Sequence, residues 1–75
     1  MAHQTEFLIQ RMKEEEAKAE AATLVKVRQL HERAAASWAK LAHRAIAADR
    51  LRAAEEERKE AMRAEVEARQ EEAMA

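Results

Sequence analysis

The side chains best suited to hold a metal ion or a haem are three histidines, His3, His31 and His43. A helix presents two ligands to one ion when they lie three or four residues apart. No histidine, cysteine or carboxylate stands at those spacings from His31 or His43. We therefore expect no bound cofactor, and a histidine-based metal or haem site built between chains is the last of three functional hypotheses.

Catalysis by the other polar residues is not favoured. No histidine or carboxylate lies one helical turn from Ser37, so no base is placed to activate its hydroxyl. The glutamate clusters at 14–16 and 55–57 point around a helix, and we expect them to be solvated. The chain has no cysteine for a thiol nucleophile and no glycine for a phosphate-binding loop. The sequence predicts a protein that is not an enzyme.

The most distinctive polar feature is a row of basic residues spaced seven, seven and four positions apart: Lys26, Arg33, Lys40 and Arg44. On a helix this spacing makes one basic stripe, which could follow the phosphates of a nucleic acid. The stripe has no interleaved aromatic residues, however, and the whole chain carries a net charge of −1. We favour pairing of the stripe with an acidic first helix or with a partner's glutamates, and keep nucleic-acid association as the second hypothesis.

The elements that must position these residues follow from composition. Alanine supplies 20 of the 75 residues, Asp, Glu, Lys and Arg supply 29 more, and glycine and proline are absent. The chain is therefore predicted to be all-α, with one helical domain over residues 1–75. Its longest run of large apolar residues is Phe7–Ile9, far too short for a membrane span, and its N-terminal sequence is unlike a secretion signal. We expect a cytoplasmic protein with no membrane partner.

Thr23 is the position where the chain is expected to turn, because it precedes an apolar cluster as a helix N-cap residue does. We predict a hairpin of a short helix over about residues 5–22 and a long helix over about residues 24–72. The hairpin core would contain Leu8, Met12 and Ala19, and the short helix would cover the long one only to about Leu41. The charged segment 53–75 would be a solvated tail. A single continuous helix remains the alternative.

Residues 21–44, AATLVKVRQLHERAAASWAKLAHR, resemble a pattern in short, alanine-rich, uncharacterised helical proteins of alphaproteobacteria. The resemblance covers about a third of the chain. The matching positions are Ala21, Ala22, Thr23, Leu24, Val27, Arg28, Arg33, Ala34, Trp38, Leu41 and Ala42. It implies a natural bacterial protein with a capped turn near Thr23, and it brings no known activity.

The second helix also carries an apolar seam with steps of three and four residues, a spacing typical of coiled coils. It predicts an interface formed by Val27, Leu30, Ala34, Trp38, Leu41, Ala45, Ala48 and Leu51. Trp38 is expected to anchor this interface, to fill the hairpin core, or to do both. His31 lies at the edge of the seam, and its protonation at about pH 6 would loosen the assembly if it is half-buried there.

The predicted first helix is too short to cover this seam, and an uncovered apolar face usually marks an interface. The leading hypothesis is a non-catalytic oligomerisation or protein-interaction module. The favoured state is a homodimer that completes a helical bundle, and docking of a different protein is the other option.

Overall fold

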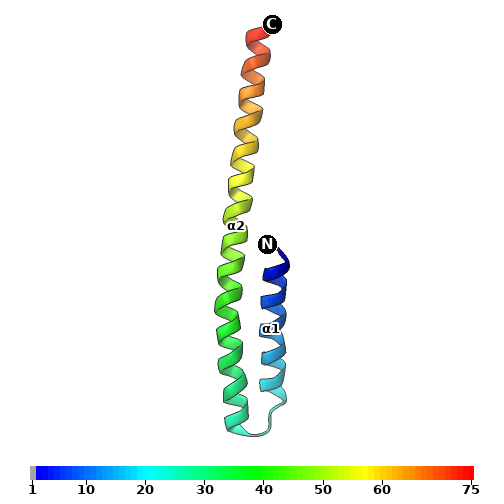
Figure 1. Cartoon of the computed structure of the whole chain (residues 1–75), viewed down its shortest axis with the longest axis vertical. Coiled ribbons are helices and arrows are strands. Elements are labelled where there is room, and N and C mark those ends of the chain that lie inside the picture. Colours follow the sequence, from blue (N-terminus) through cyan, green and yellow to red (C-terminus); the bar gives the residue numbers. More distant parts are fainter. Residues whose placement is uncertain (1) are drawn as a thin grey trace.

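The computed structural model describes residues 2–75, with side chains from His3 onward, and it contains two antiparallel helices (Figure 1). Helix α1 runs from Ala2 to Ala21, helix α2 runs from Val25 to Met74, and a short loop joins them. The molecule measures 76 × 14 × 13 Å, so it is a rod about as long as α2 itself. The predicted hairpin of a short and a long helix is confirmed, and the continuous helix is excluded.

The loop differs from the prediction that Thr23 caps the second helix. The N-cap residue is Leu24, with φ −92° and ψ 131°, and no side chain caps the helix. Thr23 lies one residue earlier, within the loop, so the predicted cap is displaced by one position. Arg28 instead reaches back across the turn, where its Nη2 donates to the carbonyl oxygen of Ala22 at 2.9 Å. No residue of the described chain has a positive φ, which explains how this loop forms without glycine.

The two helices overlap further along α2 than the sequence suggested. In Figure 1 the loop continues past the end of α1 before α2 begins. Helix α2 is therefore shifted lengthwise relative to α1. The hydroxyl of Thr5 donates to Oδ2 of Asp49 at 2.6 Å, so α1 reaches Asp49 rather than stopping at Leu41. The earlier start of α1, at Ala2 instead of residue 5, adds about one turn to this overlap.

The contact between the helices is built mainly from small and polar residues. Leu8, Ala19, Ala35 and Ala42 are the buried apolar side chains, and Met12 is half-buried. Alanines on α2 let the helices approach closely, since the distance between axes depends on side-chain size at the contact. The α1-facing seam of α2 advances by alternating steps of four and three residues: His31, Ala35, Trp38, Ala42, Ala45 and Asp49.

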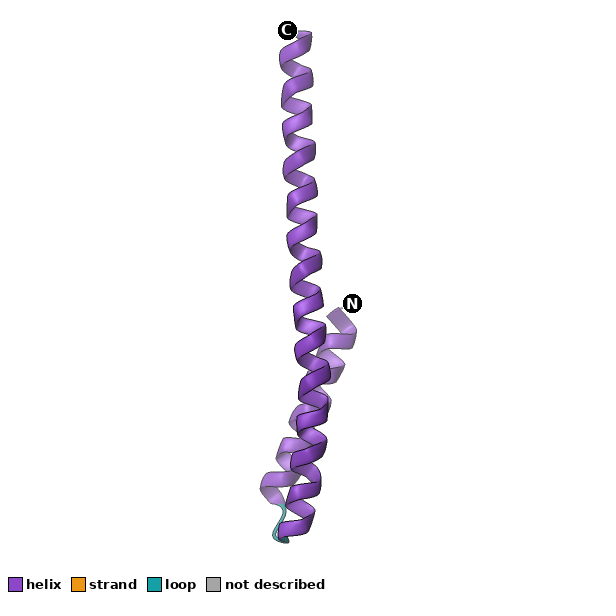
Figure 2. Ribbon diagram, turned by 90° about the vertical axis from the view of Figure 1, so that its left-hand side faces the viewer, coloured by secondary structure: helices purple, strands orange, loops and turns teal. Residues whose placement is uncertain are grey.

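Beyond this overlap α2 stands alone, as Figures 1 and 2 both show. Every residue from Arg50 to Ala75 is exposed. Pairs within the helix support this segment: Arg69 Nη2 lies 2.9 Å from Glu65 Oε1, and Lys59 Nζ lies 3.8 Å from Glu56 Oε1. The helix continues to Met74, two residues beyond the predicted end. About a third of the chain is therefore a helix that the described part of α1 leaves exposed.

Candidate interaction surface

A carboxylate and an imidazole join the helices near the loop. Nδ1 of His31 lies 2.6 Å from Oε2 of Glu15, and an ionised carboxylate can only accept, so the ring donates. Arg11 and Lys18 place nitrogens 3.6 and 3.7 Å from the other carboxylate oxygen. The hydrogen bond from His31, aided by these charges, lowers the pKa of Glu15 below its usual value. Glu15 is buried, which corrects the prediction that the whole 14–16 cluster is solvated.

This geometry also places His31 on a different face from the one expected. The sequence puts it at the edge of an assembly interface, whereas its ring packs against α1. A positive charge on a ring that faces an ionised carboxylate strengthens the contact. His31 therefore contributes to the contact between α1 and α2.

A second polar pair joins the helices at the far end of the overlap. The Thr5 hydroxyl donates to one oxygen of Asp49, and Arg52 forms an ion pair with the other. The hydrogen bond from Thr5, the largest favourable influence, and the charge of Arg52 lower the pKa of Asp49. The two ends of the α1–α2 contact are thus fixed by hydrogen-bonded carboxylates.

Trp38 fills the middle of the hairpin. Its ring meets the ring of Phe7 edge to face, with centroids 6.2 Å apart and planes at 86°. The guanidinium carbon of Arg11 lies 5.1 Å from the centroid of the Trp38 ring. These contacts leave Trp38 half-buried, so α1 already covers much of its ring.

The residues predicted to form an interface with another chain fall into two groups. Ala34, Trp38 and Ala45 are half-buried, and the last two lie in the seam that faces α1. The other members are exposed, and they are Val27, Leu30, Leu41, Ala48 and Leu51. The exposed fractions of Leu30, Leu41 and Leu51 are 62%, 43% and 62%. The hairpin therefore leaves most of the predicted interface uncovered.

These leucines continue into the tail on the same side of α2. Met62 and Val66 are also exposed, by 62% and 50%. At 100° per residue, the five positions fall within an arc of about 80°. We call this set the apolar stripe: Leu30, Leu41, Leu51, Met62 and Val66. Its centre lies roughly 120° around α2 from the seam that faces α1, so one helix presents two separate contact faces.

Met62 and Val66 are the stripe members that the sequence reasoning assigned to a solvated tail. When the predicted seam is extended in steps of three and four residues, it meets charged positions before it reaches Met62 and Val66. The apolar pattern therefore ends short of these two residues. The signal that finds them is spacing: Leu30, Leu41, Leu51 and Met62 are separated by 11, 10 and 11 residues. Eleven residues are close to three helical turns, so such positions recur on one side of a straight helix.

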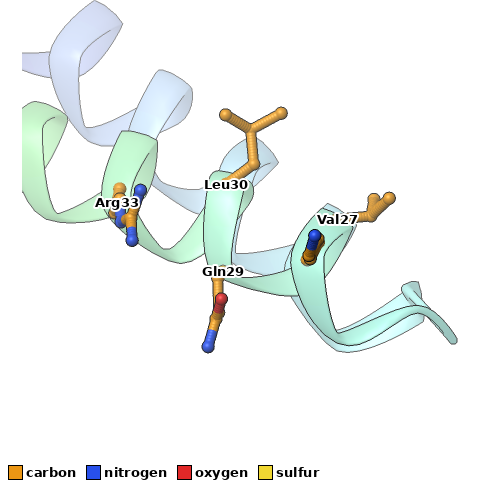
Figure 3. Close-up of a pocket in the computed structure, with 5 residues that line it drawn as sticks. Val27, Gln29, Leu30 and Arg33 are labelled. Carbon is orange, nitrogen blue, oxygen red and sulfur yellow. The ribbon is translucent and has the colours of Figure 1, made fainter.

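The basic stripe, Lys26, Arg33, Lys40 and Arg44, runs beside the apolar stripe and is exposed along its length. At its start, a shallow depression is lined by Lys26, Val27, Gln29, Leu30 and Arg33. Figure 3 shows Val27 and Leu30 on one side of this turn and Gln29 pointing the opposite way. Within residues 2–75 no ion pair engages the four basic side chains, so the predicted pairing with α1 is absent.

The remaining predicted ligands do not gather at one point. His3 and His43 are exposed, and His31 is engaged by Glu15. Among the described residues, no three histidine, cysteine, aspartate or glutamate side chains are placed to hold one metal ion. Neither described helix combines the length and the apolar character needed to cross a bilayer.

No protein family, curated protein or solved structure matches this chain.

Proposed function

We propose that this protein is a non-catalytic helical interaction module that self-associates, with a homodimer favoured, through the apolar stripe of α2. The observation that carries the proposal is the exposure of five large apolar side chains on one side of a helix whose other side is taken by α1. Large apolar side chains left exposed along one side of a helix are typical of interaction sites.

The unsupported tail gives a second reason. Helices owe most of their stability in proteins to the packing of an apolar face rather than to propensity alone. Residues 50–74 are all exposed, so the described part of α1 does not supply such packing there. A partner helix lying along the apolar stripe would supply it, and it would bury Leu51, Met62 and Val66 together.

The test is the molar mass in solution, measured by sedimentation equilibrium over a range of concentrations. We expect the unmodified chain to reach the mass of two chains. Burial of a leucine contributes about 1.5–3 kcal/mol. Leu41→Asp should therefore raise the dissociation constant at least about tenfold.

The matched control is Ala47→Asp, which adds the same charge at an exposed position outside the apolar stripe. It should leave the mass unchanged, and Trp38 fluorescence should report an intact hairpin in both variants. A single-chain mass for the unmodified protein at every concentration would refute self-association.

Nucleic-acid association is the second candidate, favoured by the four exposed and unpaired basic side chains described above. If it is correct, the protein binds duplex or single-stranded oligonucleotides at low salt, and affinity falls steeply as salt rises. Arg33→Glu combined with Lys40→Glu should abolish that binding. Absence of binding at low salt would eliminate this candidate.

A further inference from the structure

The spacing of the apolar stripe is the same in both directions along α2. Leu30, Leu41, Leu51 and Met62 are 11, 10 and 11 residues apart, so the pairs Leu30–Met62 and Leu41–Leu51 share one midpoint, residue 46. A second copy of α2 turned end for end about Ile46 would therefore bring large side chains onto large side chains at four levels. A parallel copy would also align each residue with itself, so spacing alone does not choose the direction.

The distribution of charge along α2 favours one of the two directions. Residues 26–52 carry seven basic and two acidic side chains, whereas residues 53–75 carry four basic and eight acidic ones. Parallel helices in register would set the basic part against the basic part and the acidic part against the acidic part. Like charges held side by side oppose association, and complementary potentials favour it.

The antiparallel alignment about residue 46 relieves this conflict toward the two ends, whereas residues 40–52, with four basic side chains and one acidic one, face their own copy in either direction. It sets residues 53–66 of one chain against residues 26–39 of the other. The first segment carries five acidic and three basic side chains, and the second carries three basic and one acidic. An excess of negative charge thus faces an excess of positive charge at both ends of a symmetric pair.

The position of α1 is compatible with this arrangement. It occupies the seam of α2 defined by His31, Ala35 and Ala42, roughly 120° from the apolar stripe. Thr5, near the start of α1, lies beside Asp49, and residues 53–66 are all exposed, so the described part of α1 leaves that segment uncovered. The partner's tail can therefore approach the apolar stripe without displacing α1.

We propose that two copies of this chain associate antiparallel along α2, with the exposed tail of each lying on the basic central part of the other. This inference rests on the proposed self-association and adds its direction and register. Leu30 faces Met62, Leu41 faces Leu51, and the two-fold axis passes near Ile46. The tail thereby becomes the segment that completes the interface.

Distances between spin labels on the full-length chain test the direction. The sequence has no cysteine, so a single introduced cysteine carries a single label. Ala61→Cys and Ala47→Cys place labels at exposed positions outside the apolar stripe. In the antiparallel dimer, labels at position 61 should be about 45 Å apart, because each lies 15 residues from the axis. Labels at position 47 should be closer than about 20 Å, since they flank the axis.

The outcomes separate the two proposals. A long distance at position 61 with a short distance at position 47 supports the antiparallel dimer. Short distances at both positions indicate a parallel dimer, which overturns this inference and leaves self-association standing. No dipolar coupling at either position, together with a single-chain mass, overturns both.

Discussion

Nδ1 of His31 on α2 lies 2.6 Å from Oε2 of Glu15 on α1, and this contact fixes the hairpin next to its loop. The Thr5–Asp49 hydrogen bond, also 2.6 Å long, fixes the other end of the overlap. Both contacts use carboxylates in an interface whose other side chains are mainly apolar, including the Phe7–Trp38 ring pair. The stability of the hairpin should therefore depend on pH.

Acid should open the hairpin. The pKa values of Glu15 and Asp49 are lowered from their ordinary values of 4.5 and 3.8. The unfolded chain therefore binds protons first as pH falls. The stability that each carboxylate provides is complete above its unfolded pKa and is lost as pH drops through its folded pKa. Unfolding free energies from urea titrations, followed by Trp38 fluorescence, should decrease below about pH 4.5.

Glu15→Gln is the control for this prediction. It should weaken the hairpin at neutral pH, and its difference from the unmodified protein should shrink as pH falls below that window. A difference that stays constant from neutral to acidic pH would show that the Glu15 carboxylate does not contribute as described.

Close packing at Ala42 should limit the size of its side chain. Ala42 is 1% exposed and lies in the seam against α1. Ala42→Leu should lower the unfolding free energy by about 1–3 kcal/mol, because extra methyl groups must push the helices apart. Ala47→Leu, the same change at an exposed position, should alter it by less than about 0.5 kcal/mol. Equal effects of the two substitutions in urea denaturation would contradict this packing.

A substitution at Leu24 should stabilise the start of α2. This residue occupies the N-cap position in an extended conformation, is 68% exposed, and provides no side-chain oxygen. Leu24→Asp should stabilise the protein by about 0.5–2 kcal/mol, since a carboxylate there accepts from free backbone N–H groups. Thr23→Ala should change stability by less than about 0.5 kcal/mol. Thermal melts that show a large loss for Thr23→Ala and no gain for Leu24→Asp would restore Thr23 as the cap.

The sequence predicted the number, order and approximate ends of the helices because strong helix formers fill the chain and the apolar cluster directly after Thr23 marks the turn. It also identified Leu8, Met12 and Ala19, and the structure leaves these three buried or half-buried. It did not predict which face of α2 meets α1. Hydrophobic periodicity gives most weight to leucine and valine, whereas this contact uses alanines and two carboxylate hydrogen bonds. The α2 leucines Leu30, Leu41 and Leu51 are consequently left outside the hairpin.

The polar contacts between α1 and α2 could not be predicted from the spacing of residues in the sequence. Glu15 is one of three consecutive glutamates, and only the register between α1 and α2 decides which of them faces His31. That register depends on a three-residue loop, Ala22 to Leu24, whose length was predicted as a single residue. A small change in the loop shifts every pairing along the overlap, which is why coverage ended at Asp49 instead of Leu41.

The most direct test of self-association through α2 is amide hydrogen exchange of the unmodified protein at two concentrations about a hundredfold apart. Residues 53–66 are exposed along their whole length, so their amides should exchange fast in the dilute sample. The account predicts that these amides become protected in the concentrated sample, while protection in α1 changes little. Fast exchange of residues 53–66 at both concentrations, with a single-chain mass, would contradict it.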